Sequence, residues 1–413
     1  MTTSPAAAIT TATGTHTQDR FACFNGLRAI AALSVLVHHV AGATGAVTGT
    51  FTGYAYAHFD AGVSVFFLLS GFLLYRPWAL AHLDPIGARP SPVLRTYARR
   101  RLVRILPAYW VALTVFLLIG TISVAGPRDS LAYYGLAQVY AKGRALGGIP
   151  PAWSLSVELS FYAFLPLFAG CVGRMVGAAR ARTWRSPVQV EGAAVAAMFV
   201  VGTATHAAIL HFVADPYPAS LWLPAQLGLF ALGMGLAVAS AQAESTGRPT
   251  PILAAAGRHP AWCWAGAGAT FAVASLGIGL SRVPLASMTH RQEILRQLLY
   301  GLLALLLLIP AVAAPDADRP EGRIRGFLAS PPMTALGTVS YGIFLWHFPW
   351  LVQLTRVWHL DRHAGALRFP VVLAATAALG IASGAASWFL VERPLLRYSV
   401  RIPSGRGRPN GGL

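Results

Sequence analysis

Charged residues are scarce in this sequence, and acidic ones are the scarcest. Only 11% of its 413 residues are charged, with 14 acidic against 32 basic residues and Lys142 as the single lysine. An ordinary soluble domain is about a quarter charged. The three cysteines, Cys23, Cys171 and Cys263, show no metal-ligand spacing, so neither a disulfide framework nor a metal site is expected.

Apolar segments of membrane length fill most of the chain. Hydrophobic residues make up 55% of the sequence, and a window of about 20 apolar residues is long enough to cross a bilayer. We therefore predict an all-α polytopic protein of the cell membrane, surrounded by lipid bilayer, with about ten transmembrane helices. The ten windows are 27–44, 60–80, 105–125, 153–173, 192–213, 219–241, 261–281, 294–314, 333–355 and 370–391.

The basic residues lie between these windows. A net charge of +18 can indicate a nucleic-acid binder, but such proteins collect their arginines on one soluble face or arm. Here the arginines are concentrated in alternate loops, which is the pattern of membrane topology. The positive-inside rule assigns the arginine-rich loops to the cytoplasm, so both termini are predicted to be cytoplasmic and no nucleic-acid partner is expected.

The two ends of the chain have the composition of disordered tails. Residues 1–20 are rich in Thr and Ala without the apolar core of a signal peptide, and residues 399–413 are rich in Arg, Pro and Gly. Such segments bury too little apolar surface to fold alone. We therefore expect one transmembrane domain, residues 21–398, between two tails.

Ionisable residues inside or beside the first two windows mark a candidate site. Arg28, His39 and Asp60 lie in or next to apolar segments, where ionisable groups are costly and usually functional. Arg28 and His39 are eleven residues apart, which returns a helix to within about 20° of the same face and separates them by about 16 Å along its axis. We therefore predict that both face one site.

Six motifs in order along the chain resemble the acyltransferase-3 family of integral-membrane O-acyltransferases. The resemblance implies a ten-helix domain that moves an acyl group, commonly acetyl, from acyl-CoA to a hydroxyl of a sugar, a glycan or a small natural product. Acyl-CoA is then a donor substrate, and no bound cofactor is expected. The motifs are Asn25–Ala29 with His39, Asp60–Phe72, Arg99–Pro107, Trp153–Glu158, Ser340–His347 and Val391–Pro394.

One motif departs from the family pattern. The family usually places a second acidic residue after the position of Glu158, but this chain has Leu159 and Ser160 there. Glu158 is thus the sole acid of that motif. Because a carboxylate within a membrane span needs a partner, we expect Glu158 to pair with Arg28 or Arg104.

The chemistry of acyl transfer suggests roles for the residues in the first span. His39 can act as general base, since imidazole titrates near neutrality, or it can carry the acyl group as an acyl-imidazole. Arg28 stays protonated and can hold a phosphate or the thioester carbonyl, or it can simply extend to the membrane surface. His38 points about 100° away from His39 and is expected to pack.

Other residues keep two interpretations. Asp60 either caps the second span or orients the imidazole of His39. Ser70 either packs against a neighbouring helix or faces the cavity of the candidate site. Gly62 and Gly71 in the same window permit close helix packing. Arg101 and Arg104 either mark the cytoplasmic flank or bind the phosphates of the donor.

The ninth window adds Tyr341 and His347, which we take as secondary site candidates. A different class of function also fits the intramembrane polar groups, because transporters and flippases line their translocation paths with such residues. Transporters usually contain inverted repeats with paired interrupted helices. The sequence shows no such repeat, so acyl transfer is the favoured interpretation.

Overall fold

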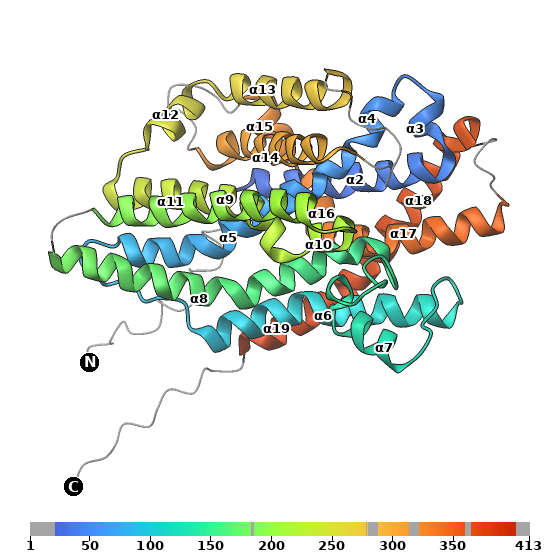
Figure 1. The fold of residues 1–413 in the computed structure, drawn as a ribbon, viewed down its shortest axis with the longest axis horizontal. Helices are drawn as coiled ribbons and strands as arrows, with labels where there is room; N and C mark the ends of the chain where they lie inside the picture. Colours follow the sequence, from blue (N-terminus) through green and yellow to red (C-terminus); the bar gives the residue numbers. More distant parts are fainter. Residues whose placement is uncertain are drawn as a thin grey trace, which may run out of the picture.

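The described part of the chain is helical throughout. A computed structural model describes residues 21–182, 186–277, 279, 288–313, 322–359 and 365–401, and these contain no β-strand. In Figure 1 the long helices run roughly along one common direction. This arrangement suits a bilayer, because a helix satisfies its backbone hydrogen bonds within itself where water is absent. The predicted all-α fold is confirmed.

Eight helical segments are long and apolar enough to cross a membrane, counted over the described residues. They coincide with eight of the ten predicted windows, so the protein is a multi-pass membrane protein. The principal helices of these segments are α2 (Cys23–Thr44), α5 (Gly62–Leu83), α6 (Leu94–Leu118), α8 (Trp153–Arg182), α9 (Pro187–Phe212), α11 (Leu223–Thr246), α14 (His290–Val312) and α18 (Gly365–Ser387).

The two remaining windows contain helices that are shorter or interrupted. In the window 261–281, α13 (Pro260–Ala272) continues into a π-helical turn, η4 (Val273–Gly277), and residues 280–281 lie outside the described part. In the window 333–355, α16 (Pro331–Thr338) and α17 (Ser340–Val357) are separated at Val339. Each predicted window therefore contains helix, but these two do not meet the same length and hydropathy criteria.

Short helices connect the long ones and close the described chain. Residues 1–20 and 402–413, most of the two predicted tails, lie outside the described residues, and the last helix reaches three residues into the predicted C-terminal tail. The short helices are α3 (Ala46–Gly49), α4 (Gly53–Ala57), η1 (Phe59–Ala61), α7 (Pro127–Tyr134), η2 (Gln138–Tyr140), η3 (Pro150–Ala152), α10 (Pro216–Ser220), α12 (Pro251–Arg258), α15 (Arg323–Leu328), η5 (Trp388–Glu392) and α19 (Arg393–Arg401).

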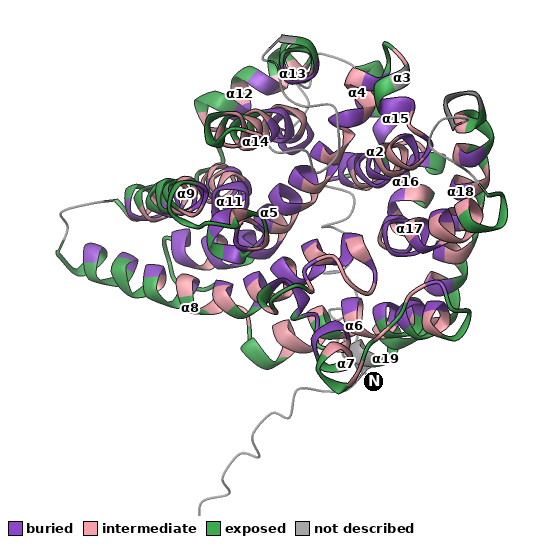
Figure 2. Cartoon of the chain, turned by 45° about the vertical axis from the view of Figure 1, so that its right-hand side comes forward, coloured by how far each residue is buried: buried purple, intermediate pink, exposed green. Residues whose placement is uncertain are grey.

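Glycines let the central helices approach closely. A Cβ atom at Gly71 of α5 would lie 2.2 Å from the Phe230 carbonyl oxygen, and one at Gly233 of α11 would lie 2.0 Å from the Leu68 carbonyl oxygen. Small residues at such crossings allow the backbones into contact. Figure 2 shows buried residues along α5 and α11 and exposed residues along α8 and α18. The α5–α11 pair is therefore part of the core that supports the site.

Two arginines cap helix ends in the arginine-rich loops. Arg325 is buried and donates to the carbonyl oxygens of Pro310 (2.6 Å) and Ala313 (2.9 Å) at the end of α14. Arg180 donates to the carbonyl oxygens of His82 and Asp84 at the end of α5. The last carbonyls of a helix lack partners within the helix and favour cations. These arginines thus stabilise helix ends, while the cytoplasmic position of the termini stays a prediction.

We predict that a Gly→Ala substitution lowers stability where the glycine lies at a close helix crossing and does not lower it where the glycine has space around it. In Gly233→Ala the new Cβ meets the Leu68 carbonyl, so α5 and α11 must move apart, and overpacking of this kind typically costs about 1–3 kcal/mol. Thermal unfolding in detergent should show a lower Tm. The control is Gly235→Ala, where the nearest atom is Val195 Cγ1 at 3.8 Å and the change gains about 0.5–1 kcal/mol of helix propensity. Equal Tm values for the two variants would contradict the packing role.

Candidate active site

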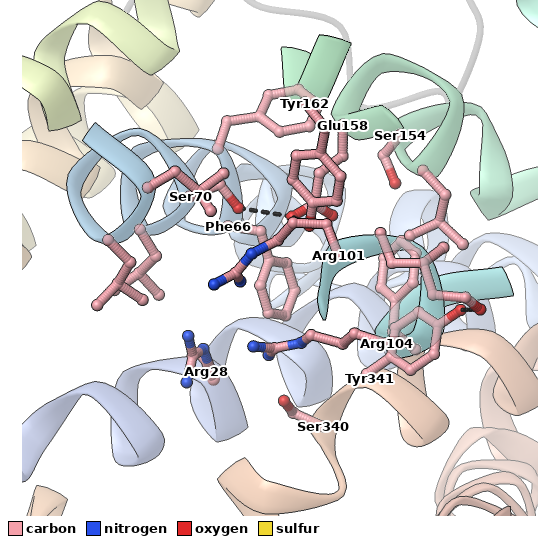
Figure 3. A pocket seen from close by; sticks show the side chains of 17 residues that line it. Arg28, Phe66, Ser70, Arg101, Arg104, Ser154, Glu158, Tyr162, Ser340 and Tyr341 are labelled. Atoms are coloured by element: carbon pink, nitrogen blue, oxygen red, sulfur yellow. Dashed lines mark hydrogen bonds between the residues drawn. The ribbon is translucent and has the colours of Figure 1, made fainter. Parts of the chain in front are cut away.

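A pocket into which several polar side chains converge lies where α2, α5, α6, α8 and α17 meet (Figure 3). It contains six of the nine residues that the sequence singled out. The polar and aromatic residues that line it are Arg28, Phe66, Phe67, Ser70, Arg101, Arg104, Ser154, Glu158, Tyr162, Ser340, Tyr341 and Phe344. Donors and acceptors from five helices thus converge on one space.

Positive charge dominates this pocket. Arg101 and Arg104 are three residues apart on α6 and so share one face, and Figure 3 shows their side chains extending toward the part of the pocket that Arg28 lines. Arg28 Nη1 donates a hydrogen bond to Asn25 Oδ1 at 3.4 Å. Three guanidinium groups therefore share the pocket with one carboxylate, that of Glu158. Such a balance favours an anionic ligand.

Hydroxyl groups hold the carboxylate of Glu158. Its Oε1 accepts hydrogen bonds from Ser70 Oγ and Tyr162 Oη, both at 2.7 Å. In the part of the chain that the structure describes, no ion pair joins Glu158 to Arg28 or Arg104. The expected partner was an arginine, but two hydroxyl donors take that place. Tyr162 was not among the predicted site residues, although its i+4 spacing from Glu158 on one helix indicates the contact.

Tyr341 forms one wall of the pocket at the start of α17. Its hydroxyl donates to the carbonyl oxygen of Ile105 at 2.8 Å, one residue after Arg104 on α6. This bond ties α17 to α6 at the level of the arginines. Tyr341 therefore lines the pocket as expected, with its hydroxyl already bound to backbone.

The two intramembrane histidines form a pair next to the pocket. His39 Nδ1 lies 2.9 Å from His347 Nε2, and the ring of His39 also contacts Phe348. Neither histidine lines the pocket itself. The connection is Phe344, which lines the pocket and whose ring centroid is 6.0 Å from that of His347. Arg28, on the shared face of α2, lines the pocket, and His39, further along the same face, belongs to the histidine pair.

Hydrogen bonding determines which nitrogen of His39 is free. His347 Nδ1 lies 3.0 Å from the carbonyl oxygen of Ile343, and a carbonyl only accepts, so His347 Nδ1 carries a hydrogen. Charged imidazoles are costly in the membrane interior without a carboxylate partner, so we treat both rings as neutral. His347 Nε2 then accepts a hydrogen bond from His39 Nδ1–H. The lone pair of His39 is consequently on Nε2, which is the atom that a base or nucleophile needs.

Asp60 lies in a different cluster, away from His39. Its Oδ1 accepts a hydrogen bond from Tyr300 Oη at 2.7 Å, and its Oδ2 is 3.5 Å from Arg296 Nη1. The prediction that Asp60 orients His39 is not supported, because His347 makes that contact; α5 also begins without a side-chain cap from Asp60. The segment between α2 and η1 folds into α3 and α4 and directs Asp60 toward α14.

The arrangement gives a candidate site within the membrane-spanning helices, a cationic pocket with an adjacent histidine pair. The chain matches the family model described as "Acyltransferase domain" over residues 21–385. It therefore belongs to the acyltransferase-3 family, and the protein is an acyltransferase that acts on a hydroxyl.

One curated relative covers most of the chain. The exopolysaccharide production protein ExoZ of Rhizobium meliloti (strain 1021) is 28% identical over 368 residues, which is 84% of this chain and 92% of that protein. No solved structure shows significant similarity to this chain.

We predict that His347 acts by holding the proton of His39 on Nδ1. His347→Ala removes the acceptor, so His39 can reach the wrong tautomer and the acyl-transfer rate should fall at least about 10-fold and at most about 10⁴-fold, the cost of the wrong tautomer in a catalytic triad. His347→Gln offers an amide oxygen as acceptor and should recover part of the rate. The measurement is kcat of the purified protein, with Tm in detergent recorded beside it. Equal kcat in the Ala and Gln variants would argue against a hydrogen-bonding role.

Proposed function

We propose that this protein transfers an acyl group, with acetyl as the expected case, from acyl-CoA to a hydroxyl of a glycan. The observation that carries the donor assignment is the pocket with three arginines against one carboxylate. Coenzyme A bears a 3′-phosphate and a diphosphate, and the planar fork of Arg is suited to phosphate. The name of the relative ExoZ, an exopolysaccharide production protein, supports a glycan as acceptor.

In this proposal the reactive end of the donor is directed toward the histidine pair. With its phosphates at Arg101 and Arg104, the pantetheine arm extends along Arg28 toward Phe344, the aromatic wall that contacts His347. The thioester then lies near His39. Glu158, held by Ser70 and Tyr162, offsets part of the positive charge of the pocket without neutralising it.

His39 supplies the proton transfer in this mechanism. Its Nε2 takes the proton of the acceptor hydroxyl while the hydroxyl oxygen attacks the thioester carbon. The carbon–sulfur bond breaks, the new ester forms, and the coenzyme A thiolate receives the proton from His39. In the second route, Nε2 itself attacks the thioester and the acceptor later takes the acyl group from the imidazole. Acyl-protein trapped with labelled donor alone distinguishes the second route from the first.

The arginines of α6 provide a test of the donor site. We expect Arg101→Gln together with Arg104→Gln to raise the KM for acetyl-CoA at least tenfold with a smaller effect on kcat, because loss of ground-state binding appears in KM. The matched control is Arg100→Gln, since Arg100 is exposed on the same helix and does not line the pocket. Thiol release is the measurement. If KM is the same in the double variant and the control, the arginines do not bind the donor.

The histidines of α2 provide a test of the chemistry. His39→Ala should lower kcat by about 10²- to 10⁴-fold, the range for loss of a general base. His38→Ala is the control, because His38 points about 100° away from His39 and its Nδ1 bonds the Tyr56 carbonyl of α4, and it should keep a measurable fraction of the activity. Tm in detergent and acetyl-CoA binding show whether each variant is folded. A folded His39→Ala protein with normal turnover would remove His39 from the mechanism.

A further inference from the structure

A second polar cluster lies at the opposite end of the helices from the arginine-rich loops. We call it the Asp60 cluster. It joins the segment before α5 to the start of α14, a helix that also packs against α9. Phe59, next to Asp60 in the chain, stacks on Phe271 of α13. Its members are His58, Asp60, His206, Glu293, Arg296 and Tyr300.

The position of this cluster follows from the direction of the helices. α2 begins at the arginine-rich end, so Arg28 precedes His39 along its axis and the turns after His39 lead to the opposite end. The segment of Asp60 enters α5 from that opposite end. His38, next to His39, bonds the carbonyl oxygen of Tyr56 in α4. The histidine pair therefore lies between the arginine pocket and the Asp60 cluster.

Hydrogen bonds within the cluster leave polar atoms without partners. Tyr300 Oη donates to Asp60 Oδ1 at 2.7 Å, so its oxygen accepts from His58 Nδ1 at 2.9 Å. The lone pair of His58 is then on Nε2, a buried atom without a protein partner. Both ring nitrogens of His206, on the α9 helix that packs against α14, are also buried and unpartnered. Buried polar atoms are normally paired, so a ligand with hydroxyl groups would satisfy them.

The charge balance of the cluster is opposite to that of the arginine pocket. Arg296 is the cation, and it faces two carboxylates, Asp60 at 3.5 Å and Glu293 at 2.7 Å. An anionic ligand would meet an excess of negative charge here. A neutral hydroxyl both donates and accepts, which matches carboxylate acceptors, guanidinium donors and the free His58 Nε2. The side chains of Asp60, Glu293 and Arg296 are 29%, 21% and 31% exposed, so the cluster is open to a ligand.

We propose that the Asp60 cluster binds the acceptor of the reaction, a neutral, hydroxyl-rich sugar unit, on the side of the protein opposite the acyl-CoA pocket. This inference rests on the proposed function. It assigns the carboxylates and Arg296 to the sugar hydroxyls, and it assigns the unpartnered nitrogens of His58 and His206 to hydroxyls deeper in the site. The acceptor thereby approaches the histidine pair from the end that coenzyme A does not occupy.

His206 provides the cleanest test, because it has no hydrogen-bond partner among the described residues. His206→Phe removes two unpaired polar atoms from a buried site, so Tm in detergent should stay equal or rise. The KM for the acceptor should nevertheless rise at least tenfold. The matched control is His211→Phe on the same helix, where the side chain is exposed, and it should leave both KM values unchanged.

The acceptor probe is the surface glycan of a strain lacking this gene, stripped of its esters by mild alkali. Purified protein, labelled acetyl-CoA and this glycan give the two KM values, and we expect only the glycan KM to change in His206→Phe and in Asp60→Asn. An unchanged glycan KM in both folded variants would overturn the inference. If the wild-type protein transfers no label to the glycan, the glycan function and this inference both fail, and acetyl-CoA binding then tests the donor pocket separately.

Discussion

The cost of placing charge in a low-dielectric interior governs how this protein is arranged. Two carboxylates within the helices, the half-buried one of Glu158 and the buried one of Glu191, have partners from distant parts of the chain. Glu191 accepts hydrogen bonds from Tyr75 and His82, and the Glu158 carboxylate accepts from two hydroxyls. Because the donors Ser70, Tyr75 and His82 all lie on α5, satisfying these carboxylates also fixes the packing of α5 against α8 and α9. The arginine pocket has more cations than carboxylates, and this excess is what makes it suited to an anionic ligand.

The same cost explains why much of the site was predictable from sequence. Arg28, Glu158 and the arginines of α6 are unusual in apolar segments, and an ionisable residue there indicates function wherever the helix lies. The helices themselves follow from apolar length. The two discrepant windows also have a physical cause, since an average over 20 residues does not register the break at Val339 or the π-helical turn after α13.

Contacts between distant segments were not predictable in the same way. His39 and His347 were both singled out, but they are 308 positions apart, and nothing local to either histidine specifies the other as its partner. Asp60 pairs with α14 across more than 230 positions, after a connection whose two short helices redirect the chain. The sequence suggested that the Asp60 carboxylate orients His39, as in a catalytic triad. In the fold, the His347 imidazole instead lies against His39 Nδ1, where it orients His39 without adding a charge.

The neutral histidine pair lies between the positively charged arginine pocket and the negatively charged Asp60 cluster, and this charge pattern affects where coenzyme A and the acyl group can go. On the proposed function, coenzyme A is polyanionic and is favoured at the arginine pocket but disfavoured at the Asp60 cluster, where carboxylates outnumber the cation. The acyl group is neutral and small. Its transfer to the acceptor, directly from the thioester or through His39 Nε2, moves no net charge past Phe344 of the pocket wall and so avoids the cost of moving charge through low dielectric. The charge pattern therefore retains the donor at one end while the acyl group reaches the other.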